Sequence, residues 1–138
     1  MTLERAIVIA TKAHAGQSNR YGQPYIFHPF RVMMKMNSDD ERIVAVLHDV
    51  LEKSDLTTAD LEKEGFSMEV TKAVDCLTRR DTENDDYFDY IERVRINPLA
   101  KAVKLADVAD NSKAVKSNMK NLDAEIFDRY QIALEMLK

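Results

Sequence analysis

The sequence predicts an all-α protein, a bundle of seven or eight short helices, on three observations. The 138 residues include only three glycines and three prolines, fewer than the turns of a sandwich or barrel usually require. Apolar residues recur through most of the chain at the three-to-four-residue spacing of amphipathic helices. No segment shows the two-residue alternation of a half-buried strand. The length fits a single domain over residues 1–138 with a hydrophobic core of its own.

Capping residues and apolar spacing place the helices of the first half. Thr2 caps a first helix, which ends before a loop predicted over 15–24 from its glycines, proline and polar residues. Pro29 suits the first turn of a second helix that ends near residue 36. The third helix, 39–51, begins with two aspartates and is apolar around much of its circumference. We therefore expect it at the centre of the bundle.

The second half shows similar boundary signals. Thr57 or Thr58 caps a fourth helix that ends near Gly65, and Ser67 caps a fifth that reaches about Thr78. The remaining expected elements are a polar turn over 81–86, a sixth helix over 87–95, a seventh that Asn97 and Pro98 open, and a last helix over 122–137.

Charge and hydropathy restrict the partners. The net charge of −4 argues against duplex nucleic acid, because phosphate contacts require a basic face. A small phosphorylated nucleotide needs only a local cluster of lysine and arginine, so it remains compatible with this charge. No stretch approaches transmembrane length and the first residues do not resemble a signal peptide, so we expect a cytoplasmic protein without a membrane partner. Assembly into a homo-oligomer is compatible with the composition.

A histidine–aspartate pair lies inside the most apolar of the expected helices. His48 and Asp49 would both be buried there, and an unpaired buried carboxylate is costly. Glu52 follows one turn later, on the same face of a continuous helix. From these residues alone, either a buried ion pair or a metal ion could compensate the charge of the buried carboxylate.

Two other segments offer groups of the same kind. Asp107 and Asn111 share one face of the seventh helix, with Lys104 one turn earlier, and His28 precedes Pro29 at the start of the second helix. Two imidazoles and two carboxylates suit Mn²⁺, Fe²⁺, Co²⁺ or Zn²⁺ better than Mg²⁺ or Ca²⁺. Four protein ligands would leave a position for a water molecule, and a metal ion lowers the pKa of bound water.

Four segments follow a known pattern in order along the chain. They are AHAGQ (13–17), GQPYIFHP (22–29), LHDVLE (47–52) and VKLADVADN (103–111). Together they resemble the hydrolase domain of RelA/SpoT-type alarmone enzymes, which belong to the HD superfamily. The resemblance implies a helical HD bundle and a metal-dependent phosphohydrolase that removes the 3′-pyrophosphate from guanosine-3′,5′-bis(diphosphate), (p)ppGpp. A chain of this length resembles the stand-alone small alarmone hydrolases and their metazoan SpoT homologues.

The resemblance also implies roles for individual residues. A divalent ion, commonly Mn²⁺, would be held by His28, His48, Asp49 and Asp107. Glu52 would orient or deprotonate the attacking water, and Asn111 would touch the nucleotide. Arg20 and Lys104, as neighbours of the motifs, are candidate phosphate contacts. The loop over 17–25 would border the substrate.

The chain departs from the family pattern at four positions. Lys53 stands where a second catalytic acid is typical, and it either binds phosphate or abolishes the usual water activation. Asn19 replaces a basic residue, Val108 an arginine and Ala114 a threonine. These changes affect the substrate side of the site and not its metal ligands. Two alternatives therefore stay open: a catalytically degenerate nucleotide-binding sensor, and a phosphohydrolase for a different nucleotide or dinucleotide phosphate.

Overall fold

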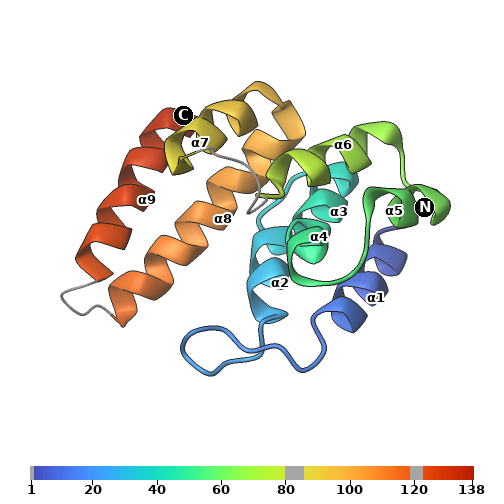
Figure 1. The fold of residues 1–138 in the computed structure, drawn as a ribbon, viewed down its shortest axis with the longest axis horizontal. Helices are drawn as coiled ribbons and strands as arrows, with labels where there is room; N and C mark the ends of the chain where they lie inside the picture. The colour runs from blue at the N-terminus through green and yellow to red at the C-terminus, as the bar shows by residue number, and fades with distance from the viewer. Residues whose placement is uncertain (1, 80–85, 119–122) are drawn as a thin grey trace.

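The computed structural model describes residues 2–79, 86–118 and 123–138 (Figure 1). Over these ranges it contains nine α-helices and no β-strand, so the expected all-α class is confirmed. The helices are α1 (Leu3–Ala13), α2 (Phe27–Met34), α3 (Asp39–Leu47), α4 (Val50–Lys53), α5 (Thr58–Lys63), α6 (Met68–Leu77), α7 (Tyr87–Ile96), α8 (Pro98–Ser117) and α9 (Asp123–Leu137).

Side-chain caps explain most of these boundaries. The Thr2 hydroxyl accepts a hydrogen bond from the Arg5 backbone N–H, and Thr57 forms a reciprocal capping box with Asp60. Helix α2 begins two residues before Pro29, earlier than expected. Most of the polar turn predicted over 81–86, like the predicted start of the last helix at residue 122, lies outside the described residues.

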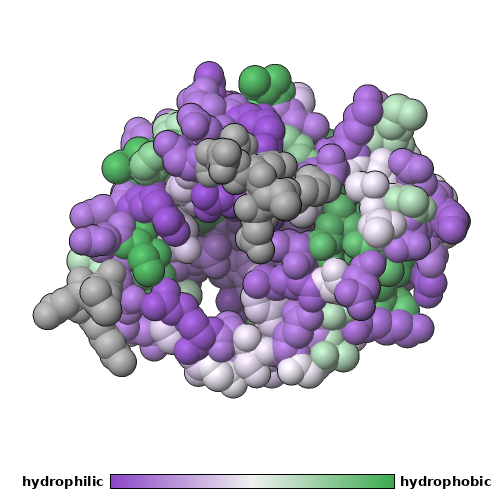
Figure 2. All heavy atoms as spheres, viewed as in Figure 1, coloured by the Kyte–Doolittle hydropathy of each residue, from purple (hydrophilic) through white to green (hydrophobic). Residues whose placement is uncertain are grey.

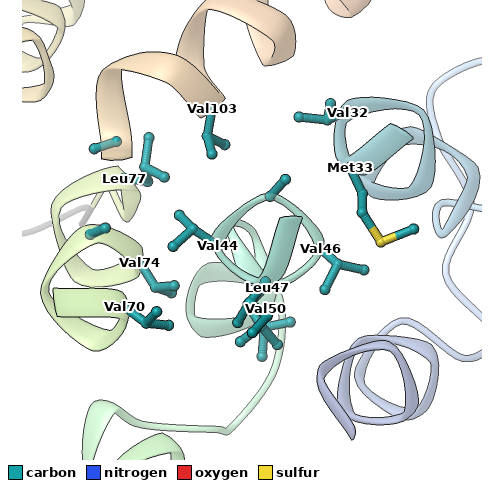
Figure 3. Close-up of a cluster of buried hydrophobic side chains, with 14 of the residues drawn as sticks. Val32, Met33, Val44, Val46, Leu47, Val50, Val70, Val74, Leu77 and Val103 are labelled. Atoms are coloured by element: carbon teal, nitrogen blue, oxygen red, sulfur yellow. The ribbon is translucent and has the colours of Figure 1, made fainter. Parts of the chain in front are cut away.

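Helix α3 occupies the centre of the hydrophobic core, as expected from its apolar circumference. It packs against α1, α2, α6 and α8, and Figure 3 shows its side chains pointing toward several of these neighbours. Val44, Val46 and Leu47 are fully buried. Each such aliphatic side chain contributes roughly 1.5–3 kcal/mol through removal from water, so the core holds α3 firmly in place.

The expectation of one continuous helix over 39–51 is wrong. Helix α3 ends at Leu47, and α4 begins only at Val50. The His48 backbone N–H and its Nδ1–H both donate to the Ala45 carbonyl, three residues back, which tightens the end of α3. Asp49 then has non-helical dihedral angles, φ −105° and ψ 0°. Apolar spacing does not reveal this interruption, because the residues on both sides of it are buried.

Helix α8 joins the two sides of the molecule. It packs against α2, α3 and α6 on one side and against α7 and α9 on the other, and Figure 1 shows α8 and α9 side by side as a hairpin. The same view of the surface is largely hydrophilic and is hollowed between α8 and α2 (Figure 2). Among the described helices, none is long and apolar enough to cross a lipid bilayer.

Candidate metal centre and adjoining pocket

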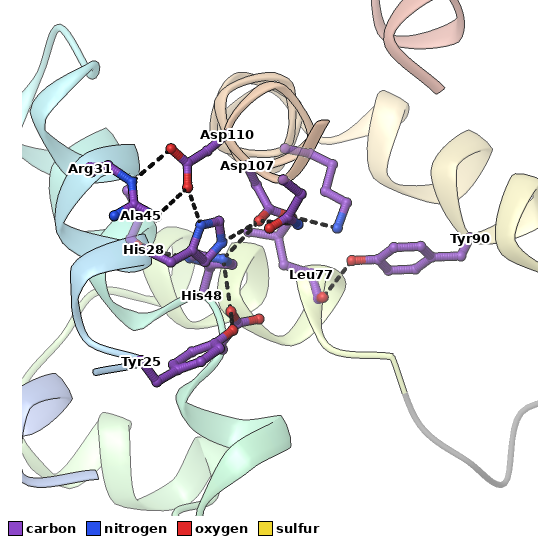
Figure 4. A network of polar contacts seen from close by, with 12 residues as sticks. Tyr25, His28, Arg31, Ala45, His48, Leu77, Tyr90, Asp107 and Asp110 are labelled. Carbon is purple, nitrogen blue, oxygen red and sulfur yellow. Dashed lines mark hydrogen bonds and ion pairs between the residues drawn. The ribbon is translucent and has the colours of Figure 1, made fainter. Parts of the chain in front are cut away.

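Four polar side chains from three parts of the fold converge at the junction of α2, α3 and α8. Asp107 Oδ1, from the middle of α8, lies 2.7 Å from His28 Nε2 and 3.3 Å from His48 Nε2. The same His48 nitrogen lies 3.1 Å from Asp49 Oδ2. Ligand atoms of His28, His48 and Asp49 all lie within 4.8 Å of one another. The structure therefore brings together the four residues that the sequence suggested as metal ligands (Figure 4).

Opposite charges compensate one another in this cluster. Burial by itself lowers the pKa of His48, but the carboxylates of Asp49 and Asp107 outweigh it and hold that pKa well above its usual value. Burial favours the neutral form of Asp107, yet Lys104 and His48 hold the pKa of this carboxyl well below its usual range. The raised pKa of the imidazole and the lowered pKa of the carboxyl both favour the charged forms, which stabilise one another.

The donor set fits a divalent transition-metal ion. His48 Nε2 is fully buried and has no well-aligned hydrogen-bond partner among the described residues, although it points toward two carboxylate oxygens. A buried imidazole nitrogen that faces carboxylates without a good hydrogen bond is an available ligand atom. Two imidazole nitrogens and two carboxylates match the preference of Mn²⁺, Fe²⁺, Co²⁺ or Zn²⁺.

Each imidazole is oriented by a contact on its outer nitrogen. His28 Nδ1 donates to Asp110 Oδ2 at 2.7 Å, and His48 Nδ1 donates to the Ala45 carbonyl. Both Nε2 atoms therefore face the cluster. Outer contacts of this kind fix the tautomer and ring orientation of a metal-binding histidine.

Each of the two carboxylates also accepts a hydrogen bond from a neighbouring side chain. The Tyr25 hydroxyl donates to Asp49 Oδ2, and Lys104 Nζ donates to Asp107 Oδ2 at 2.7 Å. Because Lys104 binds Oδ2, the other oxygen of Asp107, Oδ1, faces the two imidazoles. Burial and the Asp49 carboxylate raise the pKa of Tyr25 far above its usual value, so its hydroxyl remains protonated and able to donate.

Lys104, a predicted phosphate contact, forms an ion pair inside the centre in this structure. Its ammonium forms the ion pair with Asp107 and lies 4.9 Å from the centre of the Tyr90 ring, and the side chain is only 12% exposed. Tyr90 is in turn held by a hydrogen bond from its hydroxyl to the Leu77 carbonyl, 2.6 Å (Figure 4). The spacing of three residues between Lys104 and Asp107 was visible in the sequence, but it did not reveal that the pair is buried.

A pocket of about 490 Å³ adjoins the cluster, between the loop after α1 and helices α2, α8 and α9. Two predicted substrate contacts, Arg20 and Asn111, line it, together with Lys53. Lys104 is not among the described residues of its wall. The other described residues that line it are Gln17, Ser18, Asn19, Tyr21, Tyr25, His28, Arg31, Asp110, Ala114, Val115 and Tyr130.

Arg20 and Lys53, two of the cations predicted to lie near the substrate, differ in their surroundings. Arg20 forms an ion pair with Asp123 of α9, 2.8 Å. The Lys53 ammonium lies 4.9 Å from the centre of the Tyr25 ring and, within the part of the chain that the structure describes, makes no ion pair. Lys53 is therefore the cation of this wall that is available to an incoming anion without loss of an existing pair.

Glu52 lies on α4, beyond the junction that carries His48 and Asp49. Partial burial and the charge of the Asp49 carboxylate raise the pKa of Glu52 above its usual value. A carboxylate with a raised pKa accepts protons more readily than an ordinary exposed one. Because the helix is interrupted, the continuous face that was expected to carry all three residues does not exist.

Sequence reasoning missed three residues of the centre: Tyr25, Arg31 and Asp110. Tyr25 belongs to a recognised motif but carried no assigned role. Asp110 and Arg31 follow Asp107 and His28 by three residues each, so their positions one helical turn away were the available signal. His14, in the AHAGQ motif, supports the loop after α1, with its Nδ1 2.9 Å from Gln17 Oε1.

The chain is similar in sequence to known enzymes, although no family model matches it. It is 32% identical over 123 residues to the guanosine-3′,5′-bis(diphosphate) 3′-pyrophosphohydrolase of Aquifex aeolicus, which covers 82% of this chain and 18% of that protein. It is 39% identical over 83 residues to the Vibrio cholerae protein of the same name, covering 57% and 12%. It is 36% identical over 83 residues, 57% of this chain and 12% of the relative, to the bifunctional (p)ppGpp synthase/hydrolase SpoT of Escherichia coli K12.

A solved structure has a similar overall fold. It belongs to a metazoan orthologue of SpoT described as hydrolysing ppGpp, with a TM-score of 0.82, 21% identity, and coverage of 99% of this chain and 85% of that one. The chain belongs to the RelA/SpoT family. It is an HD-type domain of that family, and it spans less than a fifth of the length of the bacterial relatives named above.

Proposed function

We propose that this RelA/SpoT-type domain is a metal-dependent phosphohydrolase that removes the 3′-pyrophosphate from (p)ppGpp. The observation that carries the proposal is the convergence of His28, His48, Asp49 and Asp107 beside a pocket lined by cations. The names of the bacterial relatives and of the metazoan structure support this choice of substrate. Mn²⁺ is the ion that we propose for the centre.

The residues of the chain divide the chemistry among them. A bound divalent ion would lower the pKa of a water molecule so that hydroxide is available near neutral pH. Glu52, with its raised pKa, positions this water or takes its proton. Attack at phosphorus breaks the bond to the 3′-oxygen, and pyrophosphate and a nucleoside 3′-hydroxyl are the products. Lys53 and Arg20 offset the negative charge of the phosphates.

Ligand and base variants test this division of roles. Asp107→Ala and Asp49→Ala are expected to lose Mn²⁺ binding and hydrolysis together, because each removes a ligand. Glu52→Gln is expected to bind Mn²⁺ normally and to turn over (p)ppGpp roughly 10²–10⁴ times more slowly, the usual contribution of a general base. Metal content and release of pyrophosphate are measured on the same preparations. A fully active Asp107→Ala protein without metal would overturn the proposal.

One alternative rests on Lys53, which stands where a second catalytic acid is typical: a nucleotide sensor that binds (p)ppGpp without hydrolysing it. A sensor would bind (p)ppGpp tightly without hydrolysis, and Lys53→Asp would create hydrolysis in it. In the proposed enzyme the same substitution weakens substrate binding instead, because a phosphate contact is lost. A panel of other nucleotides and dinucleotide phosphates, tested with Mn²⁺, separates both outcomes from hydrolysis of a different substrate.

A further inference from the structure

A pair of charged residues that the proposed mechanism does not use lies behind the His28 imidazole. Asp110 Oδ2 is 2.7 Å from His28 Nδ1. Arg31 binds the same carboxylate twice, through Nε at 2.8 Å to Oδ1 and through Nη2 at 3.0 Å to Oδ2 (Figure 4). Asp110 is buried, whereas the Arg31 side chain is 45% exposed. A bidentate arginine holds a carboxylate in a single orientation.

This pair repeats the geometry of the inner cluster one helical turn away. Arg31 follows His28 by three residues on α2, and Asp110 follows Asp107 by three residues on α8. Residues with this spacing lie one above the other on a helix. The two helices therefore present an inner contact, His28 to Asp107, and a parallel outer contact, Arg31 to Asp110.

The contact between Asp110 and His28 determines which nitrogen of the imidazole is free to bind a cation. A proton on Nδ1 that is donated to Asp110 leaves Nε2 as the atom that faces the cluster. A carboxylate behind a metal-binding imidazole also strengthens that imidazole as a ligand. Without Arg31, the Asp110 side chain would lose two of its contacts and could turn toward the adjoining pocket, whose wall both residues line.

We propose that Arg31 and Asp110 form an outer clamp that fixes the tautomer and ring orientation of His28 and thereby sets the affinity of the centre for its divalent ion. The inference rests on the proposed metal centre. In this role both are positioning residues, because they act through His28 and not on the reacting atoms.

Titration of the purified chain with Mn²⁺, followed by electron paramagnetic resonance, tests the clamp. Asp110→Ala is expected to weaken Mn²⁺ binding roughly 10–100-fold, the usual effect of losing such an outer partner. Asp110→Asn keeps an acceptor for Nδ1 but loses the charge and the arginine pair, so its loss is smaller. Arg31→Met weakens binding about tenfold, and Arg31→Lys, which keeps the charge, recovers part of that loss.

Two further measurements separate positioning from a general loss of structure. Unfolding in the presence of EDTA gives the stability of each metal-free variant, and the absorption spectrum of the Co²⁺ form reports the ligand geometry directly. The spectrum is expected to change in Asp110→Ala and to be restored toward wild type in Asp110→Asn. Arg42→Met is the matched control, because it removes an exposed arginine–aspartate pair of α3, 3.0 Å to Asp39, away from the centre.

The outcomes distinguish this inference from the proposed function. If wild type binds Mn²⁺ and the Asp110→Ala and Arg31→Met variants bind it equally well with an unchanged Co²⁺ spectrum, the clamp is refuted and the metal centre stands. If wild type binds neither ion, the proposed centre itself fails. Should Asp110→Ala not fold, the Arg31→Met result decides, with Arg31→Lys as its conservative counterpart.

Discussion

Besides the two imidazoles, a largely buried lysine faces the Asp107 carboxylate. Lys104 forms a 2.7 Å ion pair with Oδ2 of Asp107, and the Tyr90 ring covers its ammonium. Burial by itself lowers the pKa of Lys104, but Asp107 more than reverses this and holds the pKa well above its usual value. Lys104 therefore remains charged and directs the other oxygen of Asp107 toward the two imidazoles.

Replacement of Lys104 by methionine is expected to weaken Mn²⁺ binding roughly 10–100-fold, because Asp107 loses the contact that orients it. The effect should appear in metal affinity more than in the KM for (p)ppGpp, since Lys104 is not among the described residues of the pocket wall. Lys116→Met, at an exposed position of the same helix, is the control. A raised KM with normal metal affinity would instead favour a phosphate contact.

Two tyrosines of one loop allow a matched comparison. Tyr25 donates its hydroxyl to Asp49, whereas the Tyr21 hydroxyl is buried without a partner among the described residues. We expect Tyr25→Phe to lower Mn²⁺ affinity about tenfold, because a hydrogen bond to a charged group contributes roughly 1.5–3 kcal/mol. Tyr21→Phe should leave both affinity and stability near wild type. Calorimetric titration of the two variants side by side measures the difference, and equal effects would contradict it.

The interruption between α3 and α4 is the element-scale feature that builds the centre. It allows His48 to end one helix and Asp49 to precede the next, so the two side chains reach the same point from a short turn. Helix α2 supplies His28, and α8 supplies Asp107. Because the second half of α3, Ile43 to Leu47, is buried in the core, the position of this turn relative to α2 and α8 is set by packing.

A single side chain ties the loop after α1 to α4. Gln17 Nε2 donates to the Lys53 carbonyl at 2.8 Å and to the Ala13 carbonyl at 3.0 Å, while its Oε1 contacts His14. The loop carries both Arg20 and Tyr25 to the pocket. Gln17 therefore fixes one wall of the pocket relative to the helix that carries Glu52 and Lys53.

Removal of this tie by Gln17→Ala is expected to destabilise the protein by roughly 1 kcal/mol, because hydrogen bonds that are partly buried or exposed are lost. We also expect a higher KM for (p)ppGpp, since the loop is no longer held against α4. Gln23→Ala serves as the control, because Gln23 is exposed on the same loop and its side chain makes no hydrogen bond within the described structure. Denaturant unfolding and steady-state kinetics provide the two readouts; a normal KM would separate Gln17 from the pocket.

At the scale of the whole molecule, most of the buried charged groups that the structure describes lie in one cluster at the junction of α2, α3 and α8, and this predicts an unusual pH dependence. The carboxylates of Asp107 and Asp110 more than offset the effect of burial on His28, and those of Asp49 and Asp107 do so for His48, so both pKa values are raised. A histidine with a raised folded-state pKa stabilises the protein fully below its unfolded value of about 6.5, and that contribution is lost as the pH rises through the folded value.

Metal-free protein in EDTA is therefore expected to melt at a higher temperature at pH 6 than at pH 8. With saturating Mn²⁺ the trend should reverse, because the imidazoles must release protons before they bind the ion and stabilisation by the ion grows with pH. Melting temperatures at pH 6, 7 and 8, with EDTA and with Mn²⁺, test both parts. An increase in the metal-free melting temperature from pH 6 to pH 8 would contradict the assignment of charged imidazoles.

The all-α class, most of the helix boundaries and the four candidate ligands were predictable from the amino-acid sequence. These properties depend on local signals: caps at Thr2 and Thr57, helical apolar spacing, and ordered motifs around His28, His48 and Asp107. Each signal is readable within a few residues, because helix start, amphipathic face and motif are properties of short segments.

Which of these groups meet, and what surrounds each of them, depends on the packing of the folded chain. In the folded chain the helix is interrupted at His48 and Asp49. The Lys104 ammonium lies against the Tyr90 ring, and Arg31 and Asp110 lie behind His28. The physical reason is that burial and charge pairing depend on neighbours far apart along the chain, such as α2 and α8. One-dimensional spacing shows which face of a helix a residue occupies, but the packing of the helices decides what that face meets.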